Sequence, residues 1–225
     1  MGVGLVIPAA GSGSRFGGPL AKQFVPVHGR MILTWTLAAF RDLVDAVVLV
    51  GDDHDRLAAA AAAAGIPAQV VPGGATRQAS VAAGLAALPS AMSVVLIHDA
   101  VRPCVPRSCI RACIAALADH PAAVVAVPCA ATVKRVAAGL VEATVPRERL
   151  VLAQTPQGAR TDLARAAFAR AAHEGWTCTD DAEVMERAGH AVAVVAGDAR
   201  NLKLTTPDDL AVITALLASD AGGAG

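Results

Sequence analysis

The chain contains no tyrosine, and aromatic residues make up only 3% of its 225 residues. Since 55% of the residues are nevertheless hydrophobic, the core must be built from Ala, Val, Leu and Ile. Small aliphatic side chains of this kind suit helices that pack closely on a parallel sheet. The length fits one α/β domain. We therefore expect a single domain over residues 1–218 and a flexible Gly/Ala-rich tail over 219–225.

An excess of charge of either sign is also missing, because the formal net charge is zero. No overall field then favours nucleic acid or an anionic membrane, and we expect neither as a partner. No apolar run is long enough to cross a bilayer, and no charged segment precedes the apolar N-terminus as in a signal peptide. The five cysteines form neither a CxxC pair nor a zinc pattern, which favours reduced thiols. We expect a cytoplasmic protein.

Short apolar runs alternate with helical segments along most of the chain. The expected strands cover residues 3–8, 46–50, 69–71, 94–97, 124–127 and 192–195. The expected helices cover residues 31–40, 57–64, 76–88, 161–174 and 180–188, with two more beginning near Pro106 and Thr206. Continuous apolar strands separated by helices predict a mostly parallel, doubly wound (Rossmann-like) sheet covered on both faces.

The alternation breaks over residues 129–158, which we expect to form a protruding β-arm. Residues 132–136 and 141–145, separated by Gly139, have the pattern of an extended hairpin. A hairpin this short is marginally stable alone, so it should pack on something. A second subunit is the natural candidate, and we expect a homodimer formed through this arm.

A Gly-rich loop, residues 8–17, follows the first strand directly. Small residues let backbone N–H groups wrap a polyphosphate, and Arg15 and Lys22 add positive charge. A dinucleotide-binding loop is disfavoured because the third Gly comes one residue late and the nearest acidic residues, Asp52 and Asp53, lie too far along the chain. A Walker A loop is excluded because Gly-Lys-Ser/Thr is missing. A plain glycine turn with two surface cations stays possible from the loop alone.

An acidic residue, Asp99, closes the expected strand 94–97. Ligands of open α/β sheets bind beyond the carboxyl ends of the strands. A carboxylate there could hold Mg²⁺ between phosphate oxygens, and Arg102 could clamp a phosphate with two hydrogen bonds. The alternative is a structural Asp–Arg pair. We interpret His98 as a hydrogen-bonded structural residue.

Together these motifs resemble the nucleotidyltransferases that activate sugars and alcohols, whose signature is a strand, then Ala-Ala-Gly-x-Gly-x-Arg, then Pro and Lys. Residues 9–15 and Lys22 match it. Five further segments are similar, in order, to the 2-C-methyl-D-erythritol 4-phosphate cytidylyltransferase family: residues 73–81, 98–103, 155–157, 179–182 and 201–205. The resemblance implies Mg²⁺-dependent transfer of CMP from CTP to a polyol phosphate, 2-C-methyl-D-erythritol 4-phosphate, with release of pyrophosphate.

The resemblance also implies nucleotide contacts. The triphosphate would be lined by small residues, namely Ala9, Ala10, Gly11 and Gly13. The cytosine and ribose would meet Gly74, Ala75 and Ser80, with Ser80 helping to read the base, and Ala100 would contact the nucleotide as well. Arg15 and Lys22 would stabilise charge on the α-phosphate, and Asp99 would bind magnesium.

For the acceptor, the resemblance implies phosphate contacts from Arg102, Thr132 and Lys203. In this family the arm exchanges between the subunits of a homodimer, so Arg147 and Thr155 would reach the partner's active site. Without the resemblance, Ser80, Thr132, Arg147, Thr155 and Lys203 could each be ordinary surface, strand or turn residues. Asp180, three residues before Glu183, fits a structural helix cap.

Two positions depart from the family pattern, and rival functions stay open. Ala131 replaces the Asp that usually precedes the arm threonine, and Ala75 replaces a residue that is often polar. A cytidylyltransferase for another polyol phosphate, such as ribitol 5-phosphate, would share the fold. A noncatalytic nucleotide-sensing module would need only the loop, and the loop spacing disfavours an NAD(P)-dependent reductase.

Overall fold

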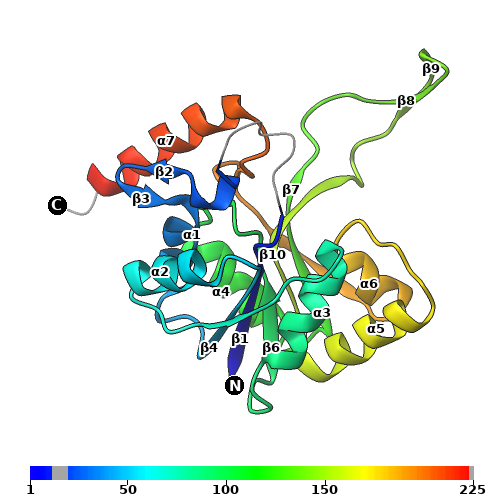
Figure 1. Ribbon diagram of the computed structural model, residues 1–225. Coiled ribbons are helices and arrows are strands. Elements are labelled where there is room, and N and C mark those ends of the chain that lie inside the picture. The colour runs from blue at the N-terminus through cyan, green and yellow to red at the C-terminus, as the bar shows by residue number, and fades with distance from the viewer. Residues whose placement is uncertain (12–19, 223–225) are drawn as a thin grey trace.

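A computed structural model of the chain describes the backbone of residues 1–11 and 20–222, and the side chains of those residues through 219. Its centre is a seven-stranded sheet (Figure 1). From edge to edge the strands are β11 (Val192–Ala196), β7 (Ala122–Pro128), β10 (Val151–Arg160), β6 (Val94–Ile97), β1 (Val3–Pro8), β4 (Ala46–Val50) and β5 (Gln69–Val71).

All neighbouring strands except those next to β10 run parallel. β1 pairs in parallel with β4 and β6, β4 with β5, and β11 with β7. β10 runs antiparallel to both of its neighbours, β6 and β7. The predicted mostly parallel sheet is thus confirmed, with one antiparallel strand inserted in its middle.

Helices cover both faces of the sheet (Figure 1). One face is covered by α1 (Ile32–Phe40), α2 (His54–Ala64), α4 (Arg107–Ala116) and α7 (Pro207–Gly222). The other is covered by α3 (Arg77–Ala87), α5 (Thr161–His173) and α6 (Asp181–Arg187). The predicted helices are all present. Among the described helices, none has both the length and the apolar character that a membrane span needs.

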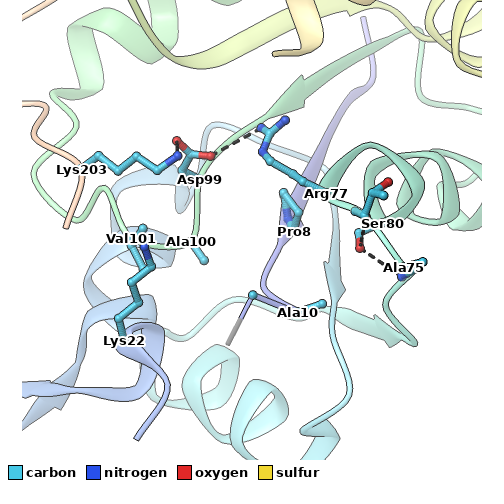
Figure 2. Close-up of a pocket in the computed structure, with 13 residues that line it drawn as sticks. Pro8, Ala10, Lys22, Ala75, Arg77, Ser80, Asp99, Ala100, Val101 and Lys203 are labelled. Atoms are coloured by element: carbon cyan, nitrogen blue, oxygen red, sulfur yellow. Dashed lines mark hydrogen bonds and ion pairs between the residues drawn. The ribbon is translucent and has the colours of Figure 1, made fainter. Parts of the chain in front are cut away.

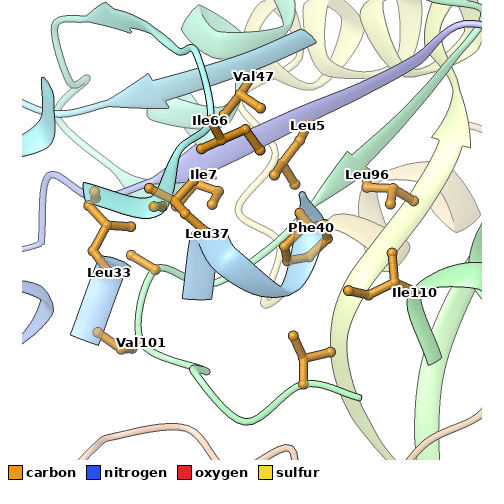
Figure 3. Close-up of a cluster of buried hydrophobic side chains, with 14 of the residues drawn as sticks. Leu5, Ile7, Leu33, Leu37, Phe40, Val47, Ile66, Leu96, Val101 and Ile110 are labelled. Atoms are coloured by element: carbon orange, nitrogen blue, oxygen red, sulfur yellow. The ribbon is translucent and has the colours of Figure 1, made fainter. Parts of the chain in front are cut away.

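The core has two layers because successive strand residues point to opposite faces. Along β1, Leu5 and Ile7 pack with Leu37 and Phe40 of α1 in the first layer (Figure 3). Val6, between them, packs in the second layer with residues of α3. The aliphatic core that the composition demanded is therefore split between the two faces of one buried sheet.

The arm is shorter than the predicted range of residues 129–158, because residues from Val151 onward form β10 in the central sheet. Its polar residues Gln154, Thr155 and Gln157 are buried, and its pairing with β7 shifts register between Ala153 and Gln157. Polar side chains and Pro156 in its centre hide the strand pattern from the sequence. The projecting segment therefore ends before Val151 rather than at residue 158.

What remains of the arm is a two-stranded hairpin that projects from the body of the molecule (Figure 1). It consists of β8 (Val133–Ala137) and β9 (Leu140–Val145). Ala138 and Gly139 form its turn with φ values of 49° and 81°. A two-residue turn with both residues in the left-handed region matches the twist of the strands it joins.

Smaller elements lie beside the sheet. The sequence did not predict the single 3₁₀ turn η1 (Lys22–Phe24) or the small hairpin of β2 (Pro26–Val27) and β3 (Arg30–Met31). The last helix, α7, begins at Pro207 and continues to Gly222, so the expected tail from residue 219 is helical at its start.

Candidate active site

A cavity of about 370 Å³ opens at the carboxyl ends of β1 and β6 (Figure 2). It is lined by Pro8, Ala10, Gly11, Lys22, Gly74, Ala75, Thr76, Arg77, Ser80, Asp99, Ala100, Val101 and Lys203. Open α/β sheets bind their ligands at this position. Most of the residues that we predicted to contact a nucleotide are thus brought together, although they come from four separate stretches of the chain.

The loop before α3 forms one wall and is fixed by short polar contacts. The N–H of Gly74 donates to the Ser80 hydroxyl, which itself donates to the carbonyl of Thr76, both at 3.0 Å. The Thr76 side chain caps α3 by accepting from the N–H of Ala79. Gly73 comes so close to the first loop that a Cβ there would lie 2.5 Å from Cβ of Ala10. Only glycine allows this approach.

Two of the residues predicted to contact the nucleotide make hydrogen bonds within the protein. The backbone of Ala9 is used within the protein, because its N–H donates to Val50 and its carbonyl accepts from Gln23. Ala9 therefore supports the cavity without lining it. Ser80 lines the cavity, and its hydroxyl accepts from Gly74 and donates to Thr76, which fixes its position while its oxygen keeps a second lone pair. Its part in reading the base stays a prediction.

Asp99 follows the end of β6 and lies among three cations, of which Figure 2 shows Arg77 and Lys203. Its Oδ2 lies 3.1 Å from both Arg102 Nε and Lys203 Nζ, and its Oδ1 lies 3.4 Å from Arg77 Nη2. Burial alone would raise the pKa of Asp99, but Lys203, Arg77 and Arg102 outweigh it and hold that pKa well below its usual range. The carboxylate is therefore ionised whenever the protein is folded near neutral pH.

A second cavity, of about 190 Å³, adjoins the first. It is lined by Arg77, Asp99, Arg102, Ala153, Gln154, Thr155, Gln157, Thr179, Asp180 and Lys203. Three residues, Arg77, Asp99 and Lys203, line both cavities. They form the boundary at which a molecule in one cavity would meet a molecule in the other.

A buried hydrogen-bond network supports this boundary from behind. Thr155 Oγ1 accepts from the N–H of Asp99 at 3.1 Å and lies 2.9 Å from His98 Nδ1. His98 Nε2 faces the carbonyl of Arg102, so we assign the ring proton to Nε2 and let the Thr155 hydroxyl donate to Nδ1. Burial lowers the pKa of His98 to about 3, which keeps the ring neutral. His98 is the structural residue that the sequence suggested.

The loop that carries Lys203 is tied to the same network. The buried side chain of Asn201 donates to the carbonyl of Thr155 and to the side chain of Gln154, and the backbone carbonyl of Asn201 accepts from Arg102 at 2.7 Å. Arg102, with 12% of its side chain exposed, is therefore held at both ends, whereas 40% of the Lys203 side chain is exposed. Lys203 has the freedom to reach a ligand in either cavity.

Thr155 and the two arm residues differ in where the structure places them. Thr155 is only 4% exposed, its hydroxyl accepts from the N–H of Asp99 of its own chain, and it lines the second cavity there. The contact with a partner's site stays a prediction. Thr132 and Arg147 are exposed on the arm and line neither cavity. The Arg147 guanidinium instead donates to the carbonyl of Ala130. Gly13 and Arg15 lie outside the described residues.

Arg77, which lines both cavities, is a residue of the site that the sequence reasoning did not single out. It is the first residue of α3, and it reaches Asp181 of α6 as well as Asp99. A cation in the first turn of a helix is electrostatically disfavoured, because that end of the helix carries partial positive charge. This misplaced charge was the available signal that Arg77 has carboxylate partners elsewhere in the fold.

The cap at α6 agrees with the structural interpretation of its sequence. The side chain of Asp180 accepts from the N–H of Glu183 at 2.9 Å, and Glu183 accepts in return from the N–H of Thr179. Asp180 also accepts from Gln157, which fixes the floor of the second cavity. The cap thus places Thr179 and Asp180 on the wall of the site.

Known proteins resemble this chain over nearly its whole length. Residues 3–219 match the family model described as 2-C-methyl-D-erythritol 4-phosphate cytidylyltransferase. Relatives of that name from Symbiobacterium thermophilum and Deinococcus radiodurans are 42% and 46% identical. Each alignment covers 97% of this chain, and it covers 94% and 90% of the respective relative.

Solved structures agree. The crystal structure of 2-C-methyl-D-erythritol 4-phosphate cytidylyltransferase from Thermus thermophilus superposes with a TM-score of 0.80 at 37% identity, over 96% of this chain and 98% of that one. Family match, sequence relatives and fold thus point the same way. The chain belongs to the 2-C-methyl-D-erythritol 4-phosphate cytidylyltransferase family.

Proposed function

We propose that this chain is a cytidylyltransferase that transfers CMP from CTP to 2-C-methyl-D-erythritol 4-phosphate, a step in isoprenoid precursor synthesis. Its membership of the family supports the reaction and the two substrates. The observation that carries the mechanism is the pair of adjoining cavities with Arg77, Asp99 and Lys203 in their shared wall. CTP occupies the larger cavity beside the Gly-rich loop, and the acceptor phosphate enters from the second.

The chemistry is an in-line attack by an oxygen of the acceptor phosphate on the α-phosphorus of CTP. The new P–O bond forms as the bond to the β-phosphate oxygen breaks, and pyrophosphate leaves. A phosphate monoester has its second pKa near ~6 and is mostly dianionic at neutral pH, so the attack needs no general base. The barrier is the approach of two anions, which cations and N–H donors lower.

The side chains divide this task. Arg102 and Lys203 attract the acceptor phosphate from the side of the second cavity. Lys22 enters the nucleotide cavity from η1, where it can stabilise charge on the α-phosphate. The resemblance gives Arg15 the same role, although it lies outside the described residues. Ala10 and Gly11, after β1, would line the triphosphate, and the loop at Gly74 and Ala75 would meet the cytosine and ribose.

Magnesium is part of the proposal, and the donor set fits an ion that arrives with the nucleotide. Within the described residues, no group of three or more His, Cys, Asp and Glu side chains could hold a metal by itself. Mg²⁺ is commonly bound by one or two carboxylates together with substrate phosphates. Asp99 would supply the carboxylate, with Oδ1 the less crowded of its two oxygens. When bound, the ion would neutralise phosphate charge.

The homodimer and the cytoplasmic location also belong to this proposal. The arm carries large exposed apolar side chains, with Val136 57%, Leu140 74% and Val141 62% exposed. Apolar groups at the tip of a thin hairpin favour burial against another chain, and a second copy would bring Arg147 and Thr132 to its partner's cavities. The five cysteines all lie in the described part and form no disulfide there, which supports a reducing compartment.

The acceptor is the point at which the rival function would differ. A ribitol phosphate cytidylyltransferase would use the same cavities with other contacts. Pyrophosphate release should be measured with each of the four NTPs against both polyol phosphates. We expect release with CTP and 2-C-methyl-D-erythritol 4-phosphate only. A preference for ribitol phosphate would change the substrate, and no release with any pair would overturn the enzymatic function.

A further inference from the structure

Arg77 lies in the wall that the two cavities share, but its ion pair with Asp181 has no role in the function proposed so far. Arg77 Nη1 and Nη2 donate to the two oxygens of Asp181 at 2.9 and 2.7 Å, a bidentate geometry. Asp181 is only 3% exposed, so its charge needs a partner in the folded protein. The pair joins the first residue of α3 to the first residue of α6.

The same guanidinium also reaches the catalytic boundary. Arg77 Nη2 lies 3.4 Å from Oδ1 of Asp99 (Figure 2), while the other oxygen of Asp99 is paired with Arg102 and Lys203. Arg77 is one of the residues that line both cavities. A planar fork fixed by two bonds on Asp181 has little freedom to rotate, so its third contact is directional.

The charges around Asp99 give the pair a second consequence. Asp181 balances the charge of Arg77. Arg77 can therefore orient Asp99 without binding its carboxylate as tightly as an unpaired arginine would. Without Asp181, the guanidinium would turn toward Asp99 as its nearest carboxylate. The angle at which Asp99 faces the two cavities would then change.

We propose that Arg77, fixed by the buried Asp181, is a positioning residue that sets the orientation of Asp99 at the boundary between the nucleotide and acceptor cavities. The inference rests on the proposed function, because its effect is on the alignment of the two substrates. Misalignment of reacting groups by about 1 Å can cost on the order of 10²-fold in rate. We expect a loss mainly in kcat, since Arg102 and Lys203 still bind the acceptor.

The test separates a positioning role from a merely structural one by replacing the whole pair. Removing Arg77 alone leaves a buried charge unpaired and lowers the melting temperature, whereas replacing a buried ion pair by apolar residues often keeps stability. The double variant Arg77→Met with Asp181→Leu should melt near the wild-type temperature and still lose kcat on the order of 10²-fold. Recovery of both stability and turnover would overturn the proposal.

Arg77→Lys covers the case in which the double variant does not fold. Lysine keeps the charge next to Asp181 but cannot make the bidentate contact and reach Asp99 as well. We expect it to fold and bind CTP in calorimetry as the wild type does, with kcat reduced about tenfold or more. Full turnover of Arg77→Lys would contradict the proposal.

Two controls complete the experiment. Arg170→Met removes an arginine from an exposed ion pair with Glu174 on α5 and should leave kcat unchanged. Wild-type protein in the same pyrophosphate assay tests the proposed function itself. Absence of turnover there would reject the enzyme, while turnover there together with active pair variants would reject only the role of Arg77.

Discussion

Lys22 enters the nucleotide cavity away from the cations that gather at Asp99 (Figure 2). Because it stabilises charge that develops on the α-phosphate, Lys22→Ala should lower kcat on the order of 10²–10³-fold while the fold persists. Steady-state pyrophosphate release, together with a circular dichroism spectrum, measures both. Arg111→Ala, an exposed cation on α4, is the matched control. Near-normal turnover of Lys22→Ala would remove it from the catalytic set.

Arg102 should act on the acceptor rather than on the nucleotide. Its guanidinium lines the second cavity and not the first. A hydrogen bond to a charged group contributes about 1.5–3 kcal/mol, so Arg102→Ala should raise the acceptor KM roughly 10–100-fold. The KM for CTP should change much less. The acceptor KM of Arg102→Lys should lie between those of the wild type and Arg102→Ala. An unchanged acceptor KM would count against this contact.

His98 makes the stability of the protein depend on pH. Burial lowers its pKa from 6.5 to about 3, so between these values the unfolded chain binds a proton that the folded chain does not. Above pH 6.5 His98 is neutral in both states and does not affect the free energy of unfolding. Below pH 6.5 the unfolded chain takes up the proton, so the free energy of unfolding falls by about 1.4 kcal/mol per pH unit.

Urea unfolding at pH 7, 6 and 5 measures this dependence. His98→Gln should be less stable than the wild type at pH 7. Its free energy of unfolding should fall less steeply with decreasing pH, because the proton that the unfolded wild type takes up at His98 is missing. The pKa of Asp99 is also lowered in the folded protein, but Asp99 reduces the free energy of unfolding only when the pH falls below its ordinary pKa of 3.8. Equal slopes in wild type and variant would contradict the assignment of a neutral, buried His98.

At the level of elements, the packing of α3 on the sheet depends on Gly84. A Cβ there would lie 2.4 Å from Cγ1 of Val6 and 2.9 Å from Cγ2 of Val50. Alanine would improve helix propensity by about 1 kcal/mol, but the clash with two branched strand residues should cost about 1–3 kcal/mol, so the clash wins. We expect Gly84→Ala to lower the free energy of unfolding. A stabilised variant would mean that α3 can move outward freely.

The elements differ in how far the sequence predicts them. β1, β4 and β6 are continuous apolar runs that end at recognisable loops, and their pattern was sufficient. β10 was missed because Gln154, Thr155 and Gln157 fill its centre and are buried only through hydrogen bonds to other segments. A strand whose polar residues are satisfied by tertiary contacts has no local signal.

The site follows the same division. Ala10, Gly11, Lys22 and Asp99 were predicted because each lies in a local motif beside a strand. The network of Arg77 with Asp181, and of Thr155 with His98, links segments that are far apart in the sequence. Such contacts depend on the topology of the sheet, which the sequence alone does not encode in any single motif.

At the scale of the whole molecule, the proposed arm exchange predicts complementation between two damaged chains. Arg147→Ala leaves Lys22 intact, and Lys22→Ala leaves the arm intact. If the arm serves the partner's site, each mixed dimer holds one complete site, and an equal mixture should regain roughly a quarter of wild-type activity. If Arg147 serves its own chain, the mixture should stay inactive. Sedimentation velocity checks that the dimers form.

The fate of the acceptor's oxygen atoms tests the central claim most directly. The acceptor phosphate, labelled with heavy oxygen, should be incubated with unlabelled CTP and Mg²⁺, and the products analysed by mass spectrometry. Attack by the acceptor phosphate on the α-phosphorus predicts that all of the label stays in the product, in which CMP is joined to the acceptor phosphate, and that pyrophosphate carries none. Label in pyrophosphate or in free inorganic phosphate, or no diphosphate product, would contradict it.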